Sequence, residues 1–214
     1  MGDWSGTRAV RVAELSLLYG VLPTAIASGI VPLQARWLVF LFTGLYVMAV
    51  LIRNRIGPPR LGLPTVRNRL VGLLAVLVVG AGLAIGFLVW ADAVPRVTSL
   101  RWSLVFVLYP AISVPAQEIF FRGFFFVRYE DLLPGALIIP VNALLFSVYH
   151  AIFGSGLAVA AAAVVGAILA AMYRGSRDLY RCWLLHYAFG VAAYLSGWAE
   201  GFTALPIFSS GGLQ

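Results

Sequence analysis

Charged residues are scarce in this chain of 214 residues: only 11% are charged, and none of the fifteen basic residues is a lysine. Soluble domains carry about a quarter charged residues, whereas 62% of this chain is hydrophobic. The single cysteine, Cys182, excludes a disulfide framework within the chain. So few charges cannot cover a surface in water, and we therefore expect an integral membrane protein.

The net charge is +7, and every one of the fifteen basic residues is an arginine. A basic balance can attract nucleic acid, but these arginines gather in short loops between apolar runs, which is the signal of membrane topology. We therefore expect the lipid bilayer, and no nucleic acid, as a partner. A cytoplasmic N-terminus leaves only Arg36, Arg96 and Arg101 on the outer side. The predicted location is the bacterial inner membrane, with the N-terminus inside and the C-terminus outside.

Apolar segments of nearly membrane-spanning length follow one another along the chain, since about 20 residues cross the roughly 30 Å of hydrocarbon. The seven segments are 12–30, 37–52, 70–90, 102–129, 136–153, 157–173 and 183–198. The sequence therefore predicts an all-α, polytopic transmembrane helix bundle of about seven spans. It forms one membrane domain, 1–214, with three spans in 12–101 and four in 102–198.

Ionisable side chains inside a membrane span are costly, so each is a functional hypothesis. Most acidic residues lie in loops or at span edges, where solvation is sufficient explanation. Glu14 lies within one turn of the start of the first span, and we expect it at the membrane interface. Four residues remain deep inside predicted spans: Glu118, Arg122, His150 and His186.

These four residues are expected to form one polar cluster, because helices bury inward polar side chains against one another. Glu118 and Arg122 are spaced i,i+4 and can pair on one helix face. His150 and His186 are the two histidines of the chain, and Gln117 adds an amide beside Glu118. The alternative is structural: a buried ion pair that fixes helix packing, with histidines that are only core residues.

A carboxylate and a neutral imidazole can together deprotonate water, and a second histidine can donate to the oxyanion that forms on an attacked carbonyl. Two histidines and a carboxylate are also a plausible zinc set. Other peptidase signatures are missing: there is no H-E-x-x-H motif, and the aspartates lie outside the predicted spans. Ser155 lacks the glycine two positions earlier that a rhomboid-type G-x-S-G motif requires, and Gly154–Gly156 is expected to form a tight turn.

Three short motifs then resemble those of the CPBP family, which contains type II CAAX prenyl endopeptidases and bacteriocin-processing or immunity proteins. QEIFFR at 117–122 is similar to the first motif, E-E-x-x-x-R, and FSVYH at 146–150 matches the second, F-x-x-x-H. HYAFG at 186–190 lies where the third, H-x-x-x-N, is expected. Order and spacing agree over about 102–198, which would then be a peptidase-like core.

The resemblance implies an intramembrane endopeptidase of the glutamic type. Carried over by position, Glu118 and His150 activate water, and Arg122 holds Glu118. His186 polarises the scissile carbonyl, and Gln117 orients the water or the peptide. Phe146 and Asn142 are candidate substrate-binding residues. No cofactor or metal is expected; if zinc binds, its ligands are Glu118, His150 and His186.

Two positions depart from the family pattern. Gln117 replaces the first glutamate, and Gly190 replaces the asparagine of the third motif. A Gln-Glu first motif resembles the family branch associated with bacterial C-terminal sorting signals, so the expected substrate is a membrane-anchored peptide or protein. Asn142 is a possible substitute for the missing amide. The alternatives are a non-catalytic scaffold or immunity-type peptide-binding protein and, less favoured, a proton-relaying transporter.

Overall fold

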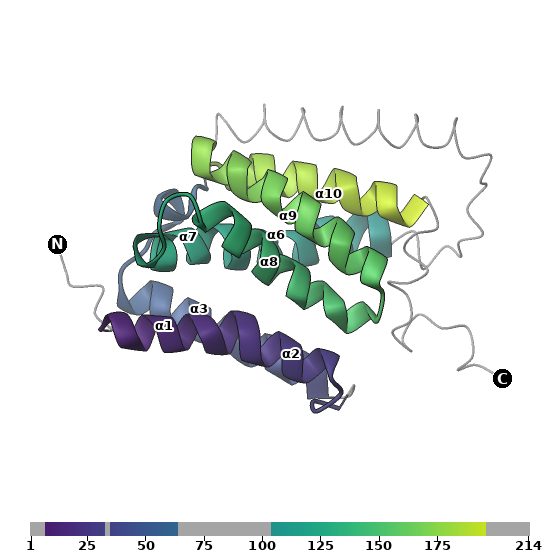
Figure 1. Ribbon diagram of the computed structural model, residues 1–214. Coiled ribbons are helices and arrows are strands. Elements are labelled where there is room, and N and C mark those ends of the chain that lie inside the picture. The colour runs from purple at the N-terminus through teal and green to yellow at the C-terminus, as the bar shows by residue number, and fades with distance from the viewer. Residues whose placement is uncertain (1–6, 33–34, 64–103, 196–214) are drawn as a thin grey trace.

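The computed structural model describes residues 7–32, 35–63 and 104–195, and every regular element in these ranges is helical. The predicted all-α fold is therefore confirmed (Figure 1). The N-terminal elements are α1 (Arg8–Ser16), the π-helical η1 (Leu17–Val21), α2 (Leu22–Ala27), α3 (Arg36–Arg53) and the short 3-10 helix η3 (Pro58–Leu61).

A second, longer helical run begins at Leu104 and alternates between π and α geometry. Its pieces are η4 (Leu104–Ser113), α6 (Val114–Glu118), η5 (Ile119–Phe124), α7 (Phe125–Tyr129) and the 3-10 turn η6 (Glu130–Leu132). The remaining elements are α8 (Ile138–His150), the 3-10 turn η7 (Ala151–Phe153), α9 (Gly156–Ser176) and α10 (Leu179–Leu195).

The helices form a layered bundle with roughly common axis directions (Figure 1). Helix α8 lies between α2 on one side and α9 on the other, and α10 packs against both α9 and α6. The turn expected around Ser155 is present: Gly154 has a left-handed conformation with φ of 67°, and the Ser155 side chain caps α9 by accepting from the Ala158 amide. This turn brings α9 back along α8.

Two helical segments in the described ranges are long and apolar enough to cross a membrane, Arg8–Ala27 and Gly156–Ser176. Two shorter apolar helices cover Leu38–Arg53 and Ile138–Phe153. Only 28% and 33% of the apolar windows in the two long segments are buried, whereas a core helix of a soluble protein would be mostly buried. The number of about seven spans stays a prediction, and its third span, 70–90, lies outside the described residues.

Large apolar side chains face outward on several helices, which is the surface that lipid contact requires. On α3 and α9 they include Phe40, Leu41, Phe42, Leu45, Met48, Ile52, Leu157, Val164 and Ile168. The helices therefore present apolar side chains both to the core and to their surroundings.

Prolines explain two of the changes in helix geometry. The π-helical η1 is followed by α2, whose first turn contains Pro23, and η4 is followed by α6, whose first turn contains Pro115. Because proline has no amide hydrogen and its ring crowds the carbonyl four residues earlier, the preceding turn cannot keep regular α-helical bonding. At Pro23 the helix therefore shows a local change to π geometry.

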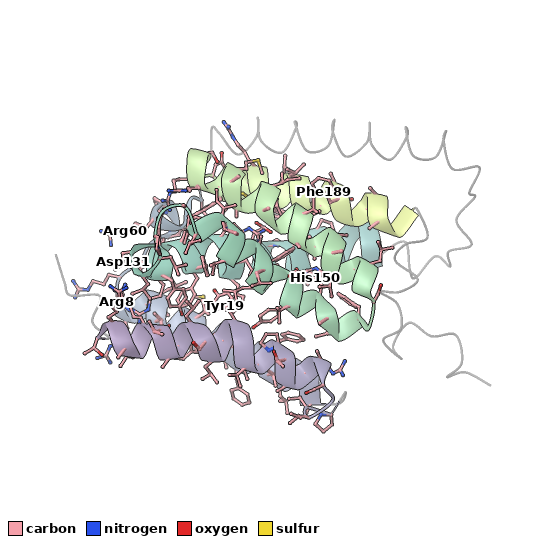
Figure 2. The ribbon with its side chains drawn as sticks, viewed as in Figure 1. Arg8, Tyr19, Arg60, Asp131, His150 and Phe189 are labelled. Carbon is pink, nitrogen blue, oxygen red and sulfur yellow. The ribbon has the colours of Figure 1, made fainter. Side chains whose placement is uncertain are left out.

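Arginines from distant parts of the chain meet acidic residues at one end of the bundle, where Arg8, Arg60 and Asp131 lie (Figure 2). Arg11 makes two hydrogen bonds of 2.7 Å to Asp131, and these bonds lower the pKa of that carboxyl. Arg177 pairs with Glu130 through one hydrogen bond from its Nη2. These arginines are among those predicted to be cytoplasmic, while the orientation of the N-terminus in the membrane stays a prediction.

Among the acidic residues that the structure describes, Glu14 lies in an environment that was not expected. It is 7% exposed and pairs with Arg128, which is 6% exposed; Nη2 of Arg128 lies 2.8 Å from Oε2 of Glu14. The interfacial position was predicted from the first span alone, without the packing of α1 on α7. Each residue supplies the counter-charge that allows the other to be buried.

We predict that Arg128→Met destabilises the protein by about 3–5 kcal/mol, because it leaves the Glu14 carboxylate buried without a partner. The double variant Glu14→Leu/Arg128→Met should recover most of this loss, since a buried pair replaced by apolar residues is often neutral. Unfolding of the purified protein in detergent measures both. The matched control is Asp131→Asn, which breaks an exposed pair and should cost at most about 1 kcal/mol. Equal losses in the single and double variants would contradict the pairing.

Candidate active site

The helix that carries Glu118 changes from α to π geometry directly after that residue. Such π segments shift the helical bonding pattern and occur frequently at functional sites. Side chains from other helices bond to the backbone here: the Tyr19 hydroxyl donates to the carbonyl of Phe120, and Asn142 Nδ2 donates to that of Phe121, both at 2.7 Å. Since an unpaired carbonyl is costly in an apolar environment, these bonds stabilise the irregular segment.

The Glu118 carboxylate lies between a guanidinium and an imidazole. Its Oε1 is 2.7 Å from Nδ1 of His186 on α10, and its Oε2 is 3.5 Å from Nε of Arg122 one turn later. The side chains of Glu118 and Arg122 are almost completely buried, at 1% and 0% exposure. Opposite charges at this depth require each other, so the pair predicted from the i,i+4 spacing is present.

Arg122 is held by two further helices. Its Nη2 donates to the carbonyl of Gly166 on α9 at 3.2 Å, and its guanidinium carbon lies 4.5 Å from the ring centroid of Phe146 on α8. Stacking of this kind suits the flat, weakly hydrated guanidinium. Arg122 thus connects three helices around the Glu118 carboxylate.

Both histidines lie beside the ring of Phe146. The ring centroids of His150 and His186 are 4.6 Å and 5.5 Å from that of Phe146. Nδ1 of His150 lies 2.9 Å from the backbone carbonyl of Phe146. A carbonyl only accepts hydrogen bonds, so this contact assigns the proton to Nδ1 and leaves Nε2 of a neutral ring as an acceptor.

The predicted site residues make different contacts within this cluster. Glu118 is hydrogen-bonded to His186, whereas His150, which the sequence analysis expected to activate water together with Glu118, bonds to the Phe146 carbonyl. Gln117 donates to the hydroxyl of Ser113 on its own helical run at 3.0 Å and makes no hydrogen bond to Glu118. Neighbouring positions on a helix point in different directions, which explains why these two side chains separate.

The two predicted substrate-binding residues have structural partners. The amide nitrogen of Asn142 donates one hydrogen bond to the carbonyl of Phe121. Phe146 is 1% exposed, because its ring is enclosed by Arg122 and the two histidines. Both side chains therefore contribute to the packing around the site.

Tyr109 is a neighbour of the site that the sequence analysis missed. Its ring lies edge-on to His186, with centroids 6.3 Å apart and an interplanar angle of 83°. A tyrosine in an apolar span is not conspicuous, and no motif includes it. The one signal in the sequence is indirect: Gly190, one turn after His186, leaves space that a large side chain from another helix must fill.

The two best-formed apolar grooves in the described part of the chain lie away from this site. Two apolar grooves, of about 660 and 450 Å³, flank the α1–α2 helix, and neither is lined by Glu118, His150 or His186. Within the described ranges, no three His, Cys, Asp or Glu side chains are arranged to hold a metal ion. The site is defined by its buried charges and hydrogen bonds.

The family model for type II CAAX prenyl endopeptidase Rce1-like proteins matches residues 98–192, a stretch that contains Glu118, His150 and His186. Residues 98–192 are an Rce1-like domain. The family predicted from the three motifs is thereby confirmed. Rce1-like proteins are membrane proteins and generally proteases, so the family supports a membrane location and a peptidase activity for this chain. Comparison with curated proteins and with solved structures found no match.

We predict that Gly166→Ala destabilises the Rce1-like domain by about 1–3 kcal/mol, the usual cost of overpacking. An added Cβ would lie 3.0 Å from Cδ1 of Phe146 and 3.2 Å from the Ala143 backbone, which would push α8 from α9. Gly175→Ala on the same helix is the control: its Cβ meets nothing within 4 Å, and alanine should gain up to about 1 kcal/mol of helix propensity. Thermal unfolding of both variants is the measurement. Equal changes in thermal stability for the two variants would show that the α8–α9 contact can accommodate the added methyl group.

Proposed function

We propose that this protein is an intramembrane endopeptidase of the glutamic type, which hydrolyses a peptide bond in a membrane-embedded or membrane-proximal substrate. The observation that supports it most is the buried Glu118 carboxylate, bonded to His186 and paired with Arg122. Buried ionisable groups with specific charge partners cluster at functional sites. The Rce1-like family gives the reaction class.

In this proposal His150 accepts the proton of the attacking water. Its Nδ1 is occupied by the Phe146 carbonyl, so Nε2 is the available base. The water oxygen bonds to the carbonyl carbon of the peptide, and the carbonyl electron pair moves onto its oxygen. When the tetrahedral intermediate collapses, the C–N bond breaks and His150 returns the proton to the leaving amine.

His186 and Glu118 act on the other side of the reacting carbonyl. A histidine whose Nδ1 is bonded to a buried carboxylate can carry a second proton on Nε2, because the carboxylate balances the imidazolium charge. Nε2 then donates to the developing oxyanion. Glu118 both orients His186 and shares the activation of water with His150. Arg122 holds Glu118 in place, and Gln117 orients the peptide through its amide.

The substrate class follows from the Gln-Glu first motif, which resembles the branch associated with bacterial C-terminal sorting signals. We propose a membrane-anchored protein whose hydrophobic C-terminal segment is removed. The second candidate is a non-catalytic scaffold or immunity-type peptide-binding protein. It is favoured by the two departures from the family pattern, Gln117 and Gly190.

We expect Glu118→Gln and His150→Gln to reduce cleavage by at least about 100-fold, the usual contribution of acid–base and orienting groups. The measurement compares trimmed C-termini in the membrane proteome of cells that lack the protein and of cells that express wild type or a variant. Asp131→Asn removes an exposed carboxylate outside the site and should cleave as wild type does.

Wild-type cleavage by folded Glu118→Gln and His150→Gln protein would remove this mechanism. Wild-type protein that retains a bound peptide and yields no trimmed C-terminus would favour the non-catalytic candidate. Folding is checked by the amount of each variant in the membrane and by its thermal stability in detergent. His150→Gln leaves the Glu118–Arg122 pair intact, so it separates loss of chemistry from loss of that pair.

Metal use has a separate test. Zinc would require Glu118, His150 and His186 as ligands, but Glu118 is already bonded to His186 and faces the positive charge of Arg122, which repels a second cation. We therefore expect cleavage to survive dialysis against a strong chelator and the purified protein to contain much less than one zinc ion per chain. Loss of activity that returns on adding zinc would contradict this prediction.

A further inference from the structure

Gly190 and Tyr109 share one space beside the candidate active site. Gly190 follows His186 by four residues on α10, so both lie on the same face of that helix. A Cβ built on Gly190 would collide with the Tyr109 hydroxyl oxygen and lie 2.6 Å from Cε1 and Cζ of the same ring. The tip of Tyr109 therefore occupies the volume that a side chain at position 190 would fill.

The Tyr109 ring lies edge-on to the His186 imidazole, and its hydroxyl lies against Gly190 one turn later on α10. Its ring lies 6.3 Å from His186, as described above, and 6.4 Å from Tyr187. Tyr109 is partly exposed, and its hydroxyl has no hydrogen-bond partner among the described residues. A tyrosine hydroxyl in apolar surroundings usually finds a partner, so a donor left free beside His186 is a feature that needs an explanation.

We propose that Tyr109 is a further catalytic residue, whose hydroxyl donates to the oxyanion together with Nε2 of His186. The inference rests on the proposed peptidase function and gives it a second donor that Gly190 cannot supply. When water attacks, negative charge develops on the carbonyl oxygen. A hydrogen bond from a neutral phenol to that charged oxygen is stronger than one to the neutral carbonyl, so it lowers the barrier without transfer of a proton.

A structural role for Tyr109 makes a different prediction. If the ring only fills the space above Gly190, phenylalanine fills it equally well, and loss of the hydroxyl has no effect on the reaction. The hydroxyl itself is therefore the group to remove.

The test is Tyr109→Phe in the full-length protein, assayed with a peptide that spans the cleavage site found in the membrane proteome. We expect kcat to fall by about 10²–10³-fold, the cost of one oxyanion donor, with KM and thermal stability nearly unchanged. The matched control is Tyr173→Phe, which removes another tyrosine hydroxyl, bonded to the Leu61 carbonyl at 3.1 Å. Its kcat should equal that of wild type.

A second pair of variants tests the shared space. Tyr109→Ala should lose activity as Tyr109→Phe does, and Tyr109→Ala/Gly190→Asn should recover part of it, because the asparagine amide then enters the emptied volume as a donor. Gly190→Asn alone should be inactive or unstable, since its side chain collides with Tyr109.

The outcomes separate the two proposals. Wild-type kcat in Tyr109→Phe, together with inactive His150→Gln, would overturn the role of Tyr109 and leave the peptidase intact. A wild-type protein without cleavage activity would overturn both. A fall in kcat for Tyr109→Phe with rescue by the double variant would support the donor at this position.

Discussion

The burial of the Glu118 carboxylate is the constraint on which the rest of the site depends. A charge in an apolar interior is tolerated only beside an opposite charge and hydrogen-bond donors. Glu118 obtains these from Arg122 on its own helical run and from His186 on α10, while Arg122 in turn needs the Gly166 carbonyl on α9 and the ring of Phe146 on α8. One carboxylate therefore fixes the relative positions of four helical elements.

The apolar environment also requires partners for the backbone carbonyls of the π-helical segments. The π-helical segments break the regular bonding pattern, and side chains bond to carbonyls within them: Tyr19 and Asn142 donate to η5, and the Tyr149 hydroxyl donates to the carbonyl of Leu18 in η1. In a membrane, water cannot supply these bonds. Asn142 thus bonds to a carbonyl that the geometry of the neighbouring helix leaves unpaired.

Family membership was predictable because it depends on local patterns. Short motifs such as FSVYH and the spacing of Glu118 from Arg122 do not depend on how the helices pack. Apolar runs of the right length likewise predict helices. Contacts between helices were less predictable. Glu14 looked interfacial from its distance to the end of a span, but its environment is decided by Arg128, a residue 114 positions away.

The sequence by itself determined that this is an all-helical, apolar chain with a few ionisable residues that must find one another, because hydrocarbon leaves such groups no other partner. Only the tertiary structure decided which ones meet: α10 turns His186 toward Glu118, the Phe146 ring contacts both histidines, and Tyr109 fills the space beside Gly190. Those choices depend on helix rotation and close packing between segments far apart in the chain, and no local pattern of residues encodes them.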